Sequence, residues 1–295
     1  MTTFRGLGAV AAAATLFLIS ACAQAGTAGG PGAAPSSVPP SGPPAGGADG
    51  LVLRVAHTGG FVGPDALAGR LPELSVYADG RMIFEGPVTA IYPGAALPNV
   101  QVRMISPEQV RELVERAVAA GVRSGTDLGQ PGVADATTTE VTVVTAAGEQ
   151  KVAANALREA SDDDPLLTPA QRQARAKLQD FLDRADKLAA GPGAQPYRPE
   201  ILAAIVTPYV EPGDDLPARP AGKEWPGPAL PGEPLTPALK LSCVTATGDQ
   251  LDAILAAAKD ANAQTPWISG GNGWTVRFRP LLPGETGCAD LKAAR

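Results

Sequence analysis

Histidine is almost missing from this chain of 295 residues, which has one histidine, His57, and three cysteines. A metal centre with imidazole ligands, or a Ser–His–Asp or Cys–His catalytic site, would have to use His57. The sequence also lacks a G-x-S-x-G nucleophile turn, a P-loop and a dinucleotide-binding glycine pattern. We therefore predict no metal site, no cofactor and no enzymatic activity, and we interpret His57 as a half-exposed residue near the end of a strand.

The apolar run near the start, Gly6 to Ser20, is too short to cross a bilayer, which takes about 20 residues. A basic residue followed by such a run is typical of a secretory signal peptide, here residues 1–21. The tetrad Ile19-Ser20-Ala21-Cys22 resembles a bacterial lipobox, in which the Cys22 thiol receives a lipid and Cys22 begins the mature chain. The alternative is an ordinary signal peptide cut after Ala23 or Ala25, which leaves Cys22 as a free thiol.

Basic side chains are outnumbered by acidic ones, 24 to 30, and the formal net charge is −6. An acidic protein gains nothing from anionic headgroups or nucleic acid, so we predict no nucleic-acid partner. Membrane attachment is expected through a Cys22 lipid with more than one acyl chain, which holds a protein stably. Residues 22–50 consist mostly of Gly, Ala, Pro and Ser, and this composition predicts a disordered tether, or alternatively an O-glycosylated stalk.

The rest of the chain alternates between strand and helix patterns. Two helix starts carry the same local signal, because Ser106-Pro107 with Gln109 and Thr168-Pro169 with Gln171 both predict a capping box with proline at the first helical position. A third helix is expected after Thr247, with Gln250 completing its cap. Strands or hairpins are predicted at 51–57, 73–86 (with an Asp79-Gly80 type I′ turn), 100–105, 139–154, 200–210, 239–245 and 274–282.

These elements predict an α+β fold with an antiparallel sheet, hairpins and packed helices. We expect an α+β domain at residues 51–206 and a smaller strand–helix–hairpin unit at 239–295. Between them, residues 207–238 are so rich in proline that we expect no regular element there, only a linker or a surface strap. Cys243 and Cys288 remain as a pair in an oxidising compartment and predict a disulfide, the alternative being two buried thiols.

Two other groups of side chains are candidates for binding. Trp267, Trp274, Arg277 and Arg279 lie close together in the last predicted hairpin, and two arginines beside tryptophan suit a carboxylate or a sugar. The alternative is a half-buried strand with a polar outer face. Carboxylates in the run Ser161–Pro165 suit calcium, but their spacing matches no EF-hand loop and an acidic turn is the simpler interpretation.

Several segments, among them "LPELSVYADGRMI" and "TPWISGGNGWTVRFRPLLP", resemble a group of uncharacterised secreted or lipid-anchored proteins of high-GC actinobacteria. This resemblance implies an envelope location and no assigned activity. We therefore expect a lipoprotein on the extracytoplasmic face of the cytoplasmic membrane. We expect it to act as a binding or accessory module for an envelope protein or a cell-wall ligand. The alternatives are a carboxylate-dependent envelope hydrolase, with a pair such as Glu73 and Asp79, and a purely structural wall-facing protein.

Overall fold

The computed structural model describes residues 47, 50–214 and 219–292. The predicted α+β class is confirmed, because the described strands form two sheets of mainly antiparallel strands that pack with helices. The predicted signal peptide, Cys22 and nearly all of the predicted tether lie outside the described residues.

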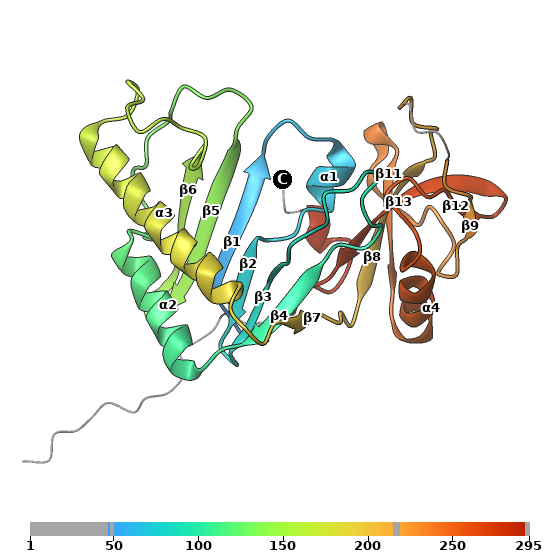
Figure 1. Cartoon of the computed structure of the whole chain (residues 1–295), viewed down its shortest axis with the longest axis horizontal. Coiled ribbons are helices and arrows are strands. Elements are labelled where there is room, and N and C mark those ends of the chain that lie inside the picture. The colour runs from blue at the N-terminus through green and yellow to red at the C-terminus, as the bar shows by residue number, and fades with distance from the viewer. Residues whose placement is uncertain (1–46, 48–49, 215–218, 293–295) are drawn as a thin grey trace, which may run out of the picture. The chain divides into compact units, whose positions relative to one another are not determined.

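The first sheet has seven strands in the order β6-β5-β1-β2-β3-β4-β7 (Figure 1). Its strands are β1 (Leu51–Gly59), β2 (Leu74–Tyr77), β3 (Arg81–Glu85), β4 (Val100–Met104), β5 (Thr137–Thr145), β6 (Gly148–Asn155) and β7 (Gln195–Pro196). A short helix, α1 (Pro64–Ala68), interrupts the predicted loop between β1 and β2.

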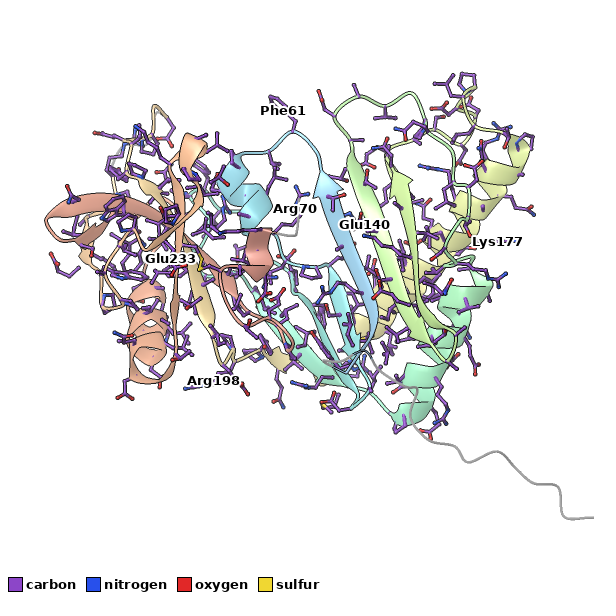
Figure 2. All side chains as sticks on the ribbon, turned by 180° about the vertical axis from the view of Figure 1, so that it is seen from behind. Phe61, Arg70, Glu140, Lys177, Arg198 and Glu233 are labelled. Atoms are coloured by element: carbon purple, nitrogen blue, oxygen red, sulfur yellow. A yellow bond between two sulfur atoms is a disulfide. The ribbon has the colours of Figure 1, made fainter. Side chains whose placement is uncertain are left out.

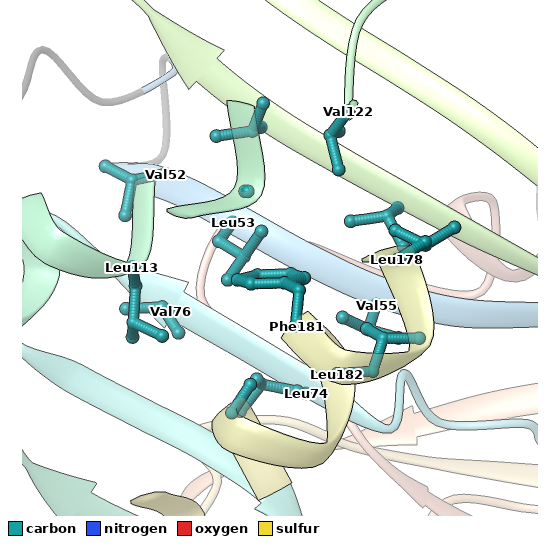
Figure 3. Close-up of a cluster of buried hydrophobic side chains, with 14 of the residues drawn as sticks. Val52, Leu53, Val55, Leu74, Val76, Leu113, Val122, Leu178, Phe181 and Leu182 are labelled. Carbon is teal, nitrogen blue, oxygen red and sulfur yellow. The ribbon is translucent and has the colours of Figure 1, made fainter. Parts of the chain in front are cut away.

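Two long helices, α2 (Pro107–Ala119) and α3 (Pro169–Ala189), cover one face of this sheet. Both begin with the capping box that the sequence predicts, at Ser106 and Thr168. The main hydrophobic core fills the space between these helices and the sheet (Figure 3). Strands β1 and β2 on one side and the two helices on the other contribute to it, with members that include Leu53, Leu74, Leu113, Leu178, Phe181 and Leu182.

The second sheet has six strands in the order β10-β11-β8-β13-β12-β9. These are β8 (Leu202–Pro208), β9 (Lys223–Glu224), β10 (Glu233–Thr236), β11 (Leu241–Ala246), β12 (Trp267–Ser269) and β13 (Asn272–Pro280). Helix α4 (Gly248–Ala258) supplies Leu251 and Ile254 to the core on one face of the sheet. Strand β8 is an interior strand, as expected. It belongs to the second sheet, although the prediction placed residues up to 206 in the first domain.

Three local predictions are wrong. The proline-rich segment does form regular elements, since β9 and β10 are both strands at the edges of the second sheet, where proline's missing N–H costs no ladder bond. The β2–β3 turn is not type I′, because Gly80 has positive φ and Asp79 does not; Gly80 N–H donates to Tyr77 O and closes a three-residue loop. Thr247 makes no side-chain cap at the start of α4.

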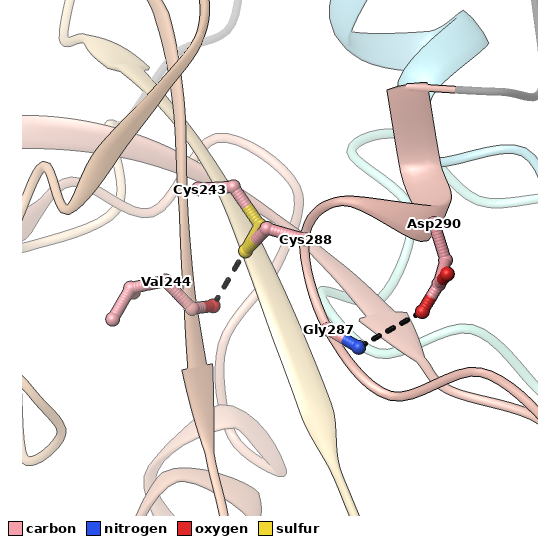
Figure 4. The surroundings of a disulfide bond; sticks show 5 residues. All are labelled: Cys243, Val244, Gly287, Cys288 and Asp290. Carbon is pink, nitrogen blue, oxygen red and sulfur yellow. Dashed lines mark hydrogen bonds between the residues drawn. A yellow bond between two sulfur atoms is a disulfide. The ribbon is translucent and has the colours of Figure 1, made fainter.

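The predicted disulfide between Cys243 and Cys288 is present (Figure 4). It joins β11 to the segment after β13, which we call the C-terminal segment (283–292). Leu291 in this segment is buried against Ile205 and Leu241 of the second sheet. Just before the segment, Leu282 packs against Tyr77 and other side chains on the helix-free face of the first sheet. The C-terminal segment therefore runs where the two sheets meet.

Candidate functional site

A cleft of about 310 Å³ lies on the helix-free face of the first sheet. Strands β1, β5 and β6 form its floor, and the turn after α1 together with the C-terminal segment forms its other walls. In Figure 2, Arg70 and Glu140 mark opposite sides of β1. The side chains that decide its chemistry are charged: Arg54, Arg70, Glu140, Lys151, Arg279, Glu285 and Asp290.

The floor is built by the two-residue period of the strands. Leu53 and Val55 of β1 enter the helix-side core, so Arg54 between them points to the helix-free face. Arg54 lies opposite Thr142 of β5 and, on its other side, opposite Ser75 of β2. Thr142 in turn lies opposite Lys151 of β6. Cross-strand partners share a face, so a row of polar residues crosses the sheet beneath the cleft.

Arg54 is the most unusual member of this row. Its Nε is buried and makes no hydrogen bond within the described residues, and its guanidinium has no carboxylate partner there either. Ser75, directly opposite, is fully buried, and its Oγ also lacks a hydrogen bond to any described residue. Buried polar atoms without partners are rare in folded proteins, and each leaves a desolvation cost of about 1–3 kcal/mol.

A second arginine reaches the cleft from the other sheet. Arg279 of β13 is 2% exposed, and its Nη2 donates to Glu285 Oε1 over 2.7 Å. Its Nη1 donates to the backbone oxygen of Pro280. Arg279 Nε is buried and has no partner among the described residues. Two arginines that face the same cleft thus each retain one buried, unused N–H donor.

The remaining charges of the cleft are satisfied locally. Lys151 Nζ lies 2.7 Å from Glu140 Oε2. Arg70 Nη1 donates to the backbone oxygens of His57 and Gly59, over 3.2 and 2.9 Å. Asp290 lines the cleft as an anion, because backbone N–H donors at Thr286 and Gly287 lower the pKa of its carboxyl. Figure 4 shows the bond from Gly287.

The cleft therefore combines four basic with three acidic side chains, in a protein whose overall charge is negative. Only two of the basic groups, Arg279 and Lys151, are paired with a carboxylate of the cleft. Arg54 has no such partner among the residues of the described chain, and Arg70 is held by backbone oxygens. With four basic and three acidic side chains the formal charge of the cleft is positive. Within the described chain, Arg54 and Arg70 are its basic groups without a carboxylate partner, and Asp290 is its acidic group without a basic partner.

His57, which also lines the cleft, takes part in a polar network that sequence reasoning missed. Its Nε2 lies 2.7 Å from Glu73 Oε2, and its Nδ1 lies 3.3 Å from the hydroxyl of Thr139. The hydrogen bond from His57 is the main reason that the pKa of Glu73 is lowered, and Arg158 adds to it. Although the trio has the residue types of a hydroxyl–imidazole–carboxylate array, Thr139 is 3% exposed and its hydroxyl is closed to a substrate.

The four residues that the sequence suggested for binding do not form one surface. Trp267 is 1% exposed and packs edge-on against Trp225 and Phe278, at centroid distances of 5.5 and 5.7 Å. Trp274 is partly buried against the same core. On β13, Arg277 and Arg279 alternate with Val276 and Phe278 of that core and so lie on the other face of the sheet.

Of the suggested residues, only Arg279 belongs to the cleft. Arg277 instead forms an ion pair with Asp65 of α1 over 3.0 Å. The predicted grouping failed because neighbours in a strand point to opposite faces. The sequence did hold a signal for Arg54, a single basic residue within an alternating apolar strand, but its cross-strand neighbours appear only in the folded sheet.

The acidic run 161–165 has a structural role. Asp164 is buried, and its carboxylate accepts hydrogen bonds from the backbone N–H groups of Gly132 and Leu166, over 3.1 and 2.8 Å. It ties the turn before α3 to the loop before β5. Within the described residues, no group of three or more His, Cys, Asp or Glu side chains is placed to hold a metal ion.

Comparisons with known proteins add no relative: no family model, no curated protein and no solved structure matches this chain. The resemblance to the actinobacterial group therefore stays a prediction. Among the described residues, no helix has the length and apolar character needed to cross a membrane.

Proposed function

We propose that this chain is an extracytoplasmic, lipid-anchored binding protein whose cleft takes a small anionic ligand, with a carboxylate or a phosphate as the recognised group. The observation that carries the proposal is the Arg54 guanidinium on the cleft floor, which has a buried and unused Nε donor and no carboxylate partner in the described chain. An oxyanion bound at the Arg54 guanidinium would accept hydrogen bonds from it and supply the negative charge that the described chain does not place there.

The dimensions of the cleft suit such a ligand. Its volume of about 310 Å³ lies at the lower end of the range for small-molecule sites, roughly 300–1,000 Å³. A guanidinium presents its donors in a planar fork, which matches two oxygens of one carboxylate or phosphate. Arg70 adds positive charge at the rim, and Lys151 and Glu140 supply one group of each sign at the far side. An anion with further polar groups is therefore favoured over a purely apolar molecule.

The location in the cell is the second part of the proposal. The lipobox-like tetrad ending in Cys22 supports attachment to the outer face of the cytoplasmic membrane, with residues 23–50 between anchor and fold. The disulfide between Cys243 and Cys288 agrees with an oxidising compartment. Because the protein is acidic overall, anionic headgroups would repel most of its surface, and the cleft is an exception to that charge.

The test compares Arg54→Gln with Arg116→Gln in the full-length protein in detergent. Arg116 is an exposed α2 residue paired with Glu112, outside the cleft, and serves as the matched control. Inorganic phosphate and acetate are the probes, and the readout is the rise in Tm with probe concentration, since a ligand that binds the native state stabilises it. We expect a saturable rise in the unaltered protein and in Arg116→Gln, and its loss in Arg54→Gln. An equal rise in all three proteins would disprove an anion site at Arg54, because general salt effects act on all of them.

A carboxylate-dependent hydrolase is the second candidate, and one observation favours it. Glu73 and Glu85 stand at the ends of paired strands, and their pKa values move apart: the bond from His57 lowers that of Glu73, while desolvation raises that of Glu85. Such divergence is common in acid–base pairs. Glu73, however, is already paired with His57 and Arg158, and it does not line the cleft. We therefore favour binding, and hydrolysis of envelope glycans that is lost in Glu85→Gln would reverse that choice.

A further inference from the structure

We propose that Glu285 is an internal carboxylate that competes with the ligand for Arg279, so that the C-terminal segment (283–292) sets the affinity of the cleft. This inference rests on the proposed anion site and specifies how that site is regulated. It concerns the second arginine of the cleft, whereas the proposed function depends on the first, Arg54.

The geometry shows Glu285 in the place of a bound carboxylate. Its Oε1 accepts from Arg279 Nη2 and its Oε2 accepts from the backbone N–H of Leu282, both over 2.7 Å. The side chains of Arg279 and Glu285 are 3% and 14% exposed, so the pair is well shielded from water. A carboxylate with one oxygen on a guanidinium and the other on a backbone N–H is bound as an external acid would be.

The ion pair with Glu285 does not use every N–H donor of Arg279. The Nε of Arg279 stays buried and without a partner among the described residues, although its guanidinium already meets Glu285. A ligand anion that displaced Glu285 would gain Nη2 and could use Nε as well. The fork of the guanidinium then binds two oxygens in place of one, which is the stronger arrangement.

Glu285 stands on a segment that is tied down on both sides of it. Before it, Tyr77 Oη donates to the backbone oxygen of Pro283 over 3.3 Å. After it, Cys288 is bonded to Cys243, and Leu291 is buried against the second sheet. These attachments hold Glu285 close to Arg279 at a high effective concentration, so an external anion pays for displacing it. The Glu285 carboxylate thereby lowers the affinity of the cleft for external anions.

The experiment measures phosphate binding, from the dependence of Tm on phosphate, in the full-length protein, in Glu285→Gln and in Arg54→Gln. Glu112→Gln, an exposed change on α2, is the control. Glutamine keeps the size of the side chain and an oxygen for the Leu282 N–H. We expect Glu285→Gln to bind phosphate about tenfold more tightly than the unaltered protein, a typical size for coupling between sites. The control should match the unaltered protein.

The outcomes separate the two proposals. If Glu285→Gln binds phosphate no more tightly while Arg54→Gln still abolishes binding, the competition is refuted and the anion site stands. If Arg54→Gln does not affect the phosphate dependence, the anion site itself fails. Loss of the Arg279 partner is expected to lower the Tm without phosphate, because a buried charge is left unpaired. As a second variant, Glu285→Ala should regain Tm in acetate by more than Glu112→Ala does, and an equal gain in both would overturn the proposal.

Discussion

Arg54 and Ser75 lie opposite each other on β1 and β2, and each carries a buried polar atom without a hydrogen bond in the described chain. The two atoms are Arg54 Nε and Ser75 Oγ. Each is a desolvated group whose interaction with water was lost on folding and not replaced. Their position in one cross-strand pair beneath the cleft links the stability of the sheet to the chemistry of the site.

Ser75→Ala is therefore expected to keep or raise stability. Removing an unsatisfied buried hydroxyl removes its desolvation cost, so we expect a gain of up to about 1 kcal/mol in the free energy of unfolding. Thr139→Ala is the comparison, since Thr139 is equally buried but has a partner in His57. That variant should lose stability. Urea unfolding of both measures the difference, and a clear loss in Ser75→Ala would show that its hydroxyl is bonded after all.

Opening the disulfide should affect both stability and the cleft. The bond joins residues 45 positions apart, and the chain-entropy relation for such a loop gives about 4 kcal/mol. The double change Cys243→Ser/Cys288→Ser should lower the free energy of unfolding by up to that amount. It also frees the C-terminal segment that carries Glu285, so we expect tighter phosphate binding than in the unaltered protein. Unchanged phosphate affinity would indicate that Leu291 alone keeps the segment in place.

Part of the loss of stability at low pH should come from protonation of Glu73. Its folded-state pKa is lowered from 4.5, first by the hydrogen bond from His57. A carboxyl with a lowered pKa contributes stability above its unfolded pKa, and this contribution is lost as the pH falls through the folded value. Glu85 and Asp186, whose pKa values are raised mainly by desolvation, act in the opposite sense.

Glu73→Gln should accordingly flatten the decline of Tm below pH 4.5, and His57→Gln should do the same through loss of the hydrogen bond. Glu149→Gln, an exposed change on β6, serves as the control and should keep the original profile. Thermal unfolding between pH 3 and pH 7 in steps of about half a unit makes the comparison. A profile for Glu73→Gln that parallels the control would contradict the role of the His57 bond.

Local signals in the sequence were sufficient for much of the fold. The starts of α2 and α3 depend on residues within four positions of each other, Ser106 with Gln109 and Thr168 with Gln171, and both capping boxes are present. The pairing of Cys243 with Cys288 followed from the cysteine count. The prediction for the proline-rich segment was wrong because proline is disfavoured in the middle of an interior strand but not in an edge strand, and edge position is a property of the whole sheet.

The candidate site could not be predicted from local sequence patterns either, because it depends on how the strands pair. Arg54 becomes notable only when β2 and β5 pair with β1 and leave its Nε without a partner. Arg279 lines the same cleft as Arg54 because β13, in the second sheet, lies next to the first sheet. Trp274, on the same strand, was predicted to belong to a binding surface with Arg279 and instead packs on the opposite face of the sheet.

The final prediction concerns attachment to the membrane, which depends on a residue outside the described part of the chain. If Cys22 carries the lipid, Cys22→Ser removes the acyl chains and with them the bilayer affinity that they supply, and the acidic protein is not drawn to anionic headgroups. Fractionation of cells that express each form should find the unaltered protein with the membranes and Cys22→Ser in the soluble fraction. Cys243→Ser/Cys288→Ser is the control for a general effect of losing cysteine and should stay with the membranes. Membrane recovery of Cys22→Ser equal to that of the unaltered protein would refute the lipid anchor.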